Sequence, residues 1–241
     1  MHKLEELVPL GFEFGEAFYF KGLGIIPILT RQPVSTPTFD TLDIALDKGT
    51  ATVREVSEGG SVSFLLVENH DTENSLLILD GEELVGGKQN RIVNTTIIIL
   101  AHASVRIPVS CVEQNRWDHR SQNFTSGKSI FKAASRAVHK QGITESLRRE
   151  GAPVSNQGQR CVWSEVSRAL DEVGTRSATS DFREAREFVS DRIEEFVKAI
   201  QPKPDQIGAL FVGERGVFGA EYNVPRKLDS ALRWQCGSGP W

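Results

Sequence analysis

The spacing of apolar residues changes near Trp117, and this change restricts the possible folds more than any other feature of the chain. Before that residue, apolar side chains occur in short runs, such as TATVREV at residues 50–56, which alternates with a period of two. Glycine, asparagine and aspartate separate the runs, as they do in turns between strands. We therefore predict that residues 1–117 form mostly strands of a mainly antiparallel sheet, folded as a sandwich or a partial barrel.

Helical spacing is typical of residues 118–201. Apolar residues recur at intervals of three and four in three segments, Ser126–Lys140, Trp163–Val173 and Asp181–Ile200. Asp181 or Ser180 is a suitable N-cap for the last segment, and Pro202 stops it. These residues are predicted to form a helical insertion that packs on one side of the sheet.

The chain returns to strand spacing at residues 205–224, where GERG at 213–216 separates two apolar runs and indicates a β-hairpin. Since two strands alone are only marginally stable in water, we expect this hairpin to rejoin the first sheet. The predicted architecture is a single α+β domain over residues 1–235, followed by a loose tail at 236–241.

Composition excludes several classes of protein. A chain of 241 residues with 39% hydrophobic residues can bury a sizeable core, and its net charge of −4 gives no general attraction to nucleic acid. The three cysteines lie far apart, which fits a reducing compartment. No apolar run approaches the length of a membrane span, and the first residues carry glutamates where a signal peptide is apolar. We expect a soluble cytoplasmic protein without a membrane partner.

A polar stretch, GEELVGGKQNR at residues 81–91, interrupts the apolar runs. Its paired glycines permit a positive φ or the close approach of a ligand. Its cations can neutralise an anion, its amides offer directional hydrogen bonds, and Glu82 can act as a base. The residues suited to ligand binding are Lys88, Gln89, Asn90 and Arg91. The alternative interpretation is a glycine bulge with a solvated polar edge.

A second polar cluster, CVEQNRWDHR at residues 111–120, follows the apolar run SVRIPVS. A turn at residues 101–104 would place this run antiparallel to residues 92–100, so that both polar clusters meet at one end of the hairpin. The second cluster adds Glu113, Gln114, Arg116 and Trp117. Carboxylates, amides, cations and an indole ring suit an anionic ligand with a flat ring, such as a nucleotide. The competing interpretation is a structural ion-pair network.

A basic stripe offers a different function. Four residues are spaced four apart, which would align them on one helix face able to contact nucleic-acid phosphates: Lys128, Lys132, Arg136 and Lys140. No aromatic residues for base stacking accompany them, so a solvated helix face is the favoured interpretation.

Taken together, the polar clusters resemble the signature of a bacterial family named for its association with ADP-ribosylglycohydrolases and rhodanese-phosphatases. The run LLILDGEELVGGKQNRIVNTTIII, followed by IPVSCVEQNRW, carries the resemblance, which extends from about Gly15 to Tyr222. The family's polar signature falls on Gly81, Glu82, Lys88, Gln89, Asn90, Arg91, Glu113, Gln114, Arg116 and Trp117. The resemblance implies a link to ADP-ribose or NAD-derived metabolites and no particular reaction. After Tyr222 the sequence departs from the family, in which a fuller final helix is expected.

The leading hypothesis is that the protein binds an ADP-ribose-like nucleotide or a similar phosphate-bearing small molecule. If the protein is an enzyme, it also processes this ligand. Lys88 and Arg116 would hold phosphate, and Trp117 would stack on a ring. Glu82 or Glu113 would be the general base, or the carboxylates would bind a divalent cation such as Mg²⁺ that bridges to phosphate. The alternatives are a non-catalytic protein-interaction module and, less favoured, a nucleic-acid binder. The sequence leaves the oligomeric state and the existence of a reaction open.

Overall fold

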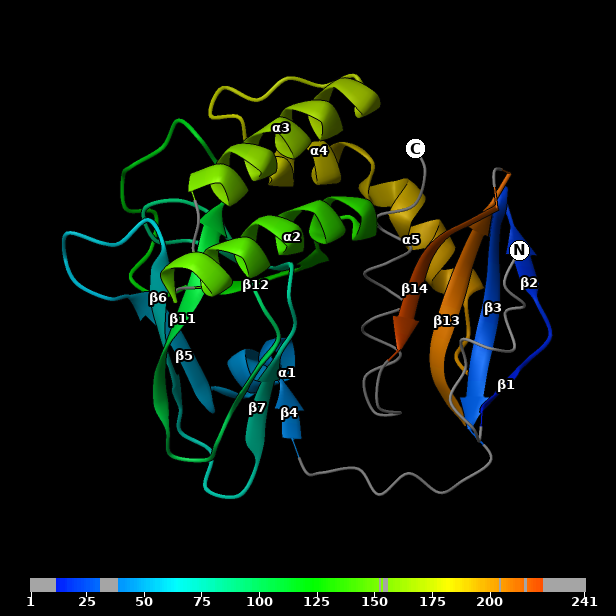
Figure 1. Cartoon of the computed structure of the whole chain (residues 1–241), viewed down its shortest axis with the longest axis horizontal. Coiled ribbons are helices and arrows are strands. Elements are labelled where there is room, and N and C mark those ends of the chain that lie inside the picture. Colours follow the sequence, from blue (N-terminus) through cyan, green and yellow to red (C-terminus); the bar gives the residue numbers. More distant parts are fainter. Residues whose placement is uncertain are drawn as a thin grey trace. The chain divides into compact units, whose positions relative to one another are not determined.

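The computed structural model describes residues 12–30, 39–151, 153, 156–203, 205–214 and 216–222. Contacts divide these residues into two compact units (Figure 1). Unit 1 takes its described residues from 12–30 and 191–222, and unit 2 takes them from 39–190. A division by contacts does not by itself decide between one domain and two, so the single domain over residues 1–235 stays a prediction. The tail at 236–241 lies outside the described residues.

Unit 1 is a five-stranded antiparallel sheet with one described helix. Its strands are β1 (Phe12–Phe14), β2 (Phe18–Phe20), β3 (Leu23–Thr30), β13 (Gln206–Gly213) and β14 (Gly216–Tyr222). The order is β1-β3-β13-β14, and β2 also pairs with β3. The helix α5 (Ser190–Ala199) packs Phe196 against a core that includes Leu23 and Phe211. The predicted C-terminal hairpin is confirmed, and the sheet that it joins is that of the N-terminal strands.

Unit 2 contains two further sheets, with strand orders β12-β8-β9-β11-β6-β5 and β10-β7-β4. The strands of the larger sheet are β5 (Ala51–Glu55), β6 (Phe64–Asn69), β8 (Glu82–Val85), β9 (Arg91–Val93), β11 (Ser104–Cys111) and β12 (Thr125–Ile130). Those of the smaller sheet are β4 (Phe39–Thr41), β7 (Ser75–Ile78) and β10 (Ile97–Ile99). The β4–β7 pair is parallel, whereas the other strand pairs among the described residues are antiparallel.

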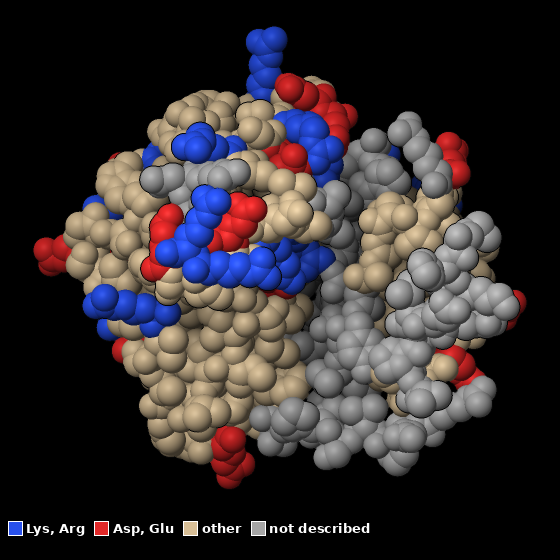
Figure 2. All heavy atoms as spheres, viewed as in Figure 1, with Lys and Arg blue, Asp and Glu red and all other residues tan. Residues whose placement is uncertain are grey.

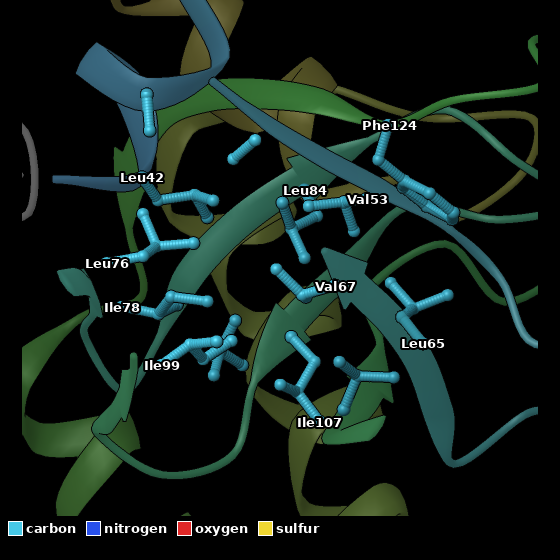
Figure 3. Close-up of a cluster of buried hydrophobic side chains, with 14 residues drawn as sticks. Leu42, Val53, Leu65, Val67, Leu76, Ile78, Leu84, Ile99, Ile107 and Phe124 are labelled. Atoms are coloured by element: carbon cyan, nitrogen blue, oxygen red, sulfur yellow. The ribbon is translucent and has the colours of Figure 1, made fainter. Parts of the chain in front are cut away.

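Side chains from both sheets of unit 2 and from the short helix α1 (Leu42–Lys48) meet in one hydrophobic core (Figure 3). Leu42 of α1, Val53 of β5 and Ile78 of β7 belong to it, and each is at most 1% exposed. The predicted alternation of residues 50–56 is confirmed, because inward and half-buried positions alternate along β5. The helix α1 ends at Gly49, whose φ of 72° is a conformation that glycine adopts without strain.

Although α5, the last part of the predicted helical insertion, packs in unit 1, three described helices of unit 2 cover one side of its larger sheet, as predicted (Figure 1). They are α2 (Ala133–Glu150), α3 (Asn156–Val173) and α4 (Phe182–Phe188). A second core joins them to the sheet and includes Ile92 of β9 and Val166 of α3. In this core the rings of Phe131 and Phe182 meet edge to face, with centroids 5.1 Å apart. None of the described helices has the length and apolar character needed to cross a membrane.

The predicted helix over Ser126–Lys140 is wrong in its first half. Residues 125–130 instead form β12, which pairs with β8 through Thr125 and Val85 and has an irregular register between Ser126 and Ile130. The helix α2 begins only at Ala133. Pairing with a distant strand therefore overrides the helical spacing of this segment, because local propensity is weaker than tertiary contacts.

Two other predicted elements are each divided in the structure. The helix over residues 181–200 is interrupted at Val189, between α4 and α5. Of the two predicted N-cap candidates, Asp181 and Ser180, it is Asp181 that caps α4, and its Oδ1 accepts a hydrogen bond from the N–H of Arg183 at 3.1 Å. The strand over residues 92–100 separates into β9, which pairs with β11, and β10, which pairs with β7.

Candidate functional site

The ends of β9 and β11 bring the two polar stretches together, as their sequence positions predict. Arg91 of β9 is paired with Cys111 of β11, and the N–H of Val112 donates to the carbonyl oxygen of Asn90 at 3.1 Å. Just beyond β11, Oε2 of Glu113 accepts a hydrogen bond from the N–H of Asn90 at 3.1 Å. The two stretches therefore form a single cluster in space.

A buried ion pair joins Glu113 and Arg116. Nε of Arg116 lies 2.7 Å from Oε1 of Glu113, and Nη2 lies 2.6 Å from Oε2, which is a bidentate geometry. Burial acts to raise the pKa of Glu113, but hydrogen bonds from Arg116 and from the N–H of Asn90 outweigh it and hold that pKa below its ordinary value of 4.5. Glu113 is therefore ionised at neutral pH with both oxygens engaged, which weighs against a role as general base.

Arg116 also holds the glycine loop. Its Nη1 donates to the carbonyl oxygens of Gly87 at 2.8 Å and Asp118 at 2.7 Å, and its Nη2 reaches that of Gly86 at 3.3 Å. Gly86 and Gly87 have φ values of 134° and 50°, which glycine adopts more readily than other residues. Every guanidinium nitrogen of Arg116 is thus engaged within the chain rather than left for a phosphate.

Asn90 connects this network to α4. Its Nδ2 donates to Oδ2 of Asp181 at 2.9 Å, and its Oδ1 accepts a hydrogen bond from the N–H of Gly86 at 3.1 Å. The side chain is completely buried. Its amide therefore fixes the start of α4 against the glycine loop, instead of facing a ligand as the sequence predicts.

The hydrogen bonding of Arg91 is incomplete among the described residues. Its side chain is 0% exposed, and Nη1 donates to Oε1 of Gln89 at 3.0 Å. Nε and Nη2 are buried without a hydrogen-bond partner among the described residues. The ring of Trp117 lies over the guanidinium, with 5.6 Å between Cζ and the ring centroid, and Nζ of Lys88 lies 5.5 Å from the same centroid. Burial lowers the pKa of Arg91, as expected for a charge that is short of partners.

Glu55 belongs to the same cluster, although no sequence motif points to it. Its side chain is 7% exposed; Oε1 accepts a hydrogen bond from the N–H of Lys88 at 3.1 Å, and Oε2 has no partner among the described residues. The charges of Glu55 and Arg91 act on each other. The burial of Glu55 could have been predicted from the alternation of β5, because Ala51 and Val53 face the core and Glu55 occupies the next inward position.

The remaining candidates of the cluster lie nearer to its surface. Nε2 of Gln89 donates to the carbonyl oxygen of Gln114 at 3.3 Å, and the side chain of Gln114 is exposed. Nζ of Lys88 donates to the carbonyl oxygen of Gly59 at 3.0 Å. Trp117 is 46% exposed. Trp117 and Gln114 are thus the candidates that solvent reaches most readily.

Glu82 and Glu113 have separate partners, so they do not form a shared cation site. Oε2 of Glu82 accepts a hydrogen bond from the N–H of Leu79 at 3.0 Å, whereas Glu113 binds Arg116 and Asn90. In the part of the chain that the structure describes, no group of three or more His, Cys, Asp or Glu side chains is arranged to hold a metal ion. The residues present therefore do not fit the predicted Mg²⁺ bridge.

Glu83, next to Glu82 in β8, carries a strongly perturbed carboxyl group. It is 1% exposed, and its Oε2 accepts a hydrogen bond from Oγ of Ser129 at 2.5 Å. Burial raises the pKa of Glu83 to about 7, although Ser129 and the charge of Arg186 act in the opposite direction. This carboxyl group is therefore partly protonated at neutral pH and lies against β12.

The predicted basic stripe is not on one helix face. Lys128 lies in β12 and Lys132 precedes the first residue of α2. Each cation lies beside a carboxylate: Lys128 with Asp47, Lys132 with Glu172, and Arg136 and Lys140 with Asp80. On the side of the molecule drawn in Figure 2, Lys and Arg side chains lie next to Asp and Glu side chains, without a uniform basic surface. The structure thus gives no support to nucleic-acid binding by these residues.

Comparison with known families agrees with the resemblance in the polar clusters. A family model described as ARPP-1, the ARG and Rhodanese-Phosphatase-superfamily-associated Protein domain, matches residues 11–228, which include every residue of the cluster. No curated protein and no solved structure matches the chain. Because the family model covers nearly all of the sequence, this chain belongs to the ARG and Rhodanese-Phosphatase-superfamily-associated Protein family.

Proposed function

We propose that unit 2 binds a small phosphate-bearing ligand of the ADP-ribose or NAD-derived class at the cluster around Arg91. The observation that carries this proposal is the buried guanidinium, whose Nε and Nη2 have no partner among the described residues. An unsatisfied buried charge is costly, and binding sites are where proteins retain such groups. The ligand class rests on the name of the family, which associates it with ARG and rhodanese-phosphatase proteins.

In this proposal the half-exposed indole of Trp117 turns outward, and a flat ring of the ligand stacks on it. Arg91 then donates hydrogen bonds to ligand oxygens, and Lys88 supplies a second positive charge for a phosphate. Arg116, to which the sequence assigns the phosphate, stays in its ion pair with Glu113. Hydrogen bonding supports this exchange of roles, because the donors of Arg116 are engaged whereas two nitrogens of Arg91 have no partner within the described part of the chain.

The rival function is a protein-interaction module in which the polar cluster only stiffens its loops. The ion pair of Glu113 and Arg116, together with the buried amide of Asn90, favours it, because these groups bind the backbone and one another. The two proposals differ in what they require of Arg91. A ligand site needs its donors, whereas a structural network gains nothing from donors that have no acceptor.

ADP-ribose is expected to raise the unfolding midpoint of the wild-type protein and to leave that of Arg91→Met unchanged. A ligand at 100 times its Kd stabilises the folded state by about 2.7 kcal/mol, which is a shift of several degrees for a chain of this size. Methionine fills much of the guanidinium's volume and removes a buried charge, so the variant is expected to fold. A thermal-shift measurement with ADP-ribose, NAD and AMP, each with and without Mg²⁺, checks the prediction.

Arg54→Met is the matched control, because Arg54 lies in β5 and its Nε pairs with Oε2 of Glu68 at 3.2 Å on the surface. It should keep the wild-type response to ligand. An equal response in Arg91→Met would place the binding site elsewhere. If none of the three compounds shifts the midpoint at millimolar concentration, the ligand proposal fails and the interaction module takes its place.

A further inference from the structure

Two buried groups of opposite hydrogen-bonding character are unsatisfied in the same cluster. Arg91 offers donors at Nε and Nη2, and Glu55 offers an acceptor at Oε2. None of these three atoms has a hydrogen-bond partner among the described residues, and the charges of the two side chains act on each other. A ligand group that satisfies both residues must therefore accept and donate hydrogen bonds at once.

Gly60 packs closely beside these groups. A carbon at its Cβ position would lie 3.3 Å from Oε2 of Glu55, 3.5 Å from Cζ2 of Trp117 and 3.1 Å from Cδ of Lys88. The acceptor, the edge of the indole ring and the lysine stem thus converge on Gly60, and any larger residue at position 60 would press on them. The φ of 75° at Gly60 also favours glycine at this turn.

We propose that Arg91 and Glu55 together bind a pair of neighbouring hydroxyl groups, as in the vicinal diol of a ribosyl group. One diol oxygen accepts from the guanidinium of Arg91, and a hydroxyl hydrogen is donated to Oε2 of Glu55. A phosphate dianion suits the position less well, because it has no hydrogen to donate and the carboxylate repels its charge. The inference rests on the proposed nucleotide-binding function and adds which part of the ligand the buried groups recognise.

The assignment also separates the roles of the two cations. Arg91 is completely buried, so it meets the part of the ligand that enters deepest. Lys88 is less buried, and its Nζ lies beside the half-exposed Trp117. In the bound state the diol is therefore inside, against Glu55 and Arg91, and the phosphate is outside, against Lys88.

The wild-type protein is expected to bind AMP about ten times more tightly than 2′-deoxy-AMP, because loss of one hydroxyl leaves a buried group unpaired. In Glu55→Gln this preference should fall to about threefold or less, since the charged acceptor is lost. Glutamine still accepts from the N–H of Lys88 through Oε1, so the fold is retained. Isothermal titration calorimetry measures both ratios, with Glu68→Gln, a surface carboxylate of neighbouring β6, as control.

The outcomes separate this inference from the function on which it rests. Equal affinities of the wild-type protein for AMP and 2′-deoxy-AMP would overturn the diol assignment and leave nucleotide binding intact. An undiminished preference in Glu55→Gln would overturn the role of Glu55. Absence of binding by both AMP and ADP-ribose would instead overturn the proposed function itself.

A pair of glycine variants tests the site without removing its charged groups. Gly60→Ala is expected to weaken AMP binding about tenfold or more, because the new methyl group would lie 3.3 Å from Oε2 of Glu55 and 3.1 Å from Cδ of Lys88 and displace both side chains. Gly49→Ala is the matched control: its φ of 72° imposes similar strain, but its Cβ would have nothing within 4 Å. We expect Gly49→Ala to bind AMP as the wild-type protein does. If AMP binding is weakened equally in both variants, backbone strain causes the loss of affinity, and the assignment is contradicted.

Discussion

Arg116→Met is expected to lower the free energy of unfolding by about 3–5 kcal/mol, because it leaves a buried carboxylate without its counter-ion. Glu113 is 0% exposed and receives two hydrogen bonds from this guanidinium. The variant also loses the donors that hold the carbonyl oxygens of Gly86 and Gly87. Urea unfolding of the wild-type and variant proteins at neutral pH measures the difference.

The surface pair of Arg54 and Glu68 again provides the control. Their side chains are 43% and 30% exposed, so Arg54→Met should cost less than about 1 kcal/mol. If Arg116→Met costs as little, Glu113 must find another counter-ion. Arg120 is placed to supply one, because its Nη2 lies 3.6 Å from Oε1 of Glu113. That result would contradict the dominant role that the geometry gives to Arg116.

Glu83→Gln is expected to remove a pH-dependent loss of stability. Burial raises the pKa of Glu83 from 4.5 to about 7. The folded state therefore binds this proton more tightly than the unfolded state, and the wild-type protein loses stability as the pH rises from 4.5 to 7. The whole shift corresponds to about 3 kcal/mol. Glutamine accepts from Ser129 and cannot ionise, so the variant should become more stable relative to the wild-type protein across this window.

Urea unfolding of both proteins at pH 5 and pH 8 checks this expectation, and the advantage of the variant should be about 2.5 kcal/mol greater at the higher pH. His139 contributes a slope of the opposite sign, because burial lowers its pKa from 6.5 to about 4 and the unfolded state binds that proton first on acidification. Glu83→Gln leaves His139 in place, so the comparison cancels its contribution. A difference that does not change with pH would show that Glu83 is ionised in the folded protein, with Arg186 as the partner that keeps it so.

The meeting of the two polar stretches could be predicted from the sequence, because antiparallel strands bring their ends together and the apolar runs beside Arg91 and Glu113 are distinct. The sequence could not predict which of the two arginines has donors without a partner among the described residues. Arg91 and Arg116 occupy similar polar surroundings in the sequence. Arg91 is buried because all of β9 is buried within unit 2, and Arg116 is engaged because its loop turns back on the glycines. Both outcomes depend on contacts between segments that are distant in the chain.

Glu55 and β12 were missed for related reasons. A glutamate at the end of a strand resembles the solvated edge of a sheet, and its nearness to Lys88 arises from contacts between separate strands. The sequence TSGKSI of β12 has no period-two apolar pattern, so only its pairing with β8 makes it a strand. The fold class, the N-cap Asp181 and the C-terminal hairpin, in contrast, follow from local patterns and were predicted.

Unit 1 combines strands from the beginning and the end of the described chain. This arrangement affects how the protein folds while it is being synthesised. Leu23 and Ile25 of β3 pack against Ala209 and Phe211 of β13. During synthesis, β3 therefore leaves the ribosome long before β13. At about 5–20 residues per second, the apolar side of β3 waits roughly 10–40 s for that partner. Unit 2 has its own cores and can fold during the wait. A nascent or prematurely terminated chain therefore presents a folded unit 2 joined to an apolar strand that has β1 and β2 on one edge and lacks β13 on the other. Such an open edge is a substrate for chaperones and a starting point for aggregation.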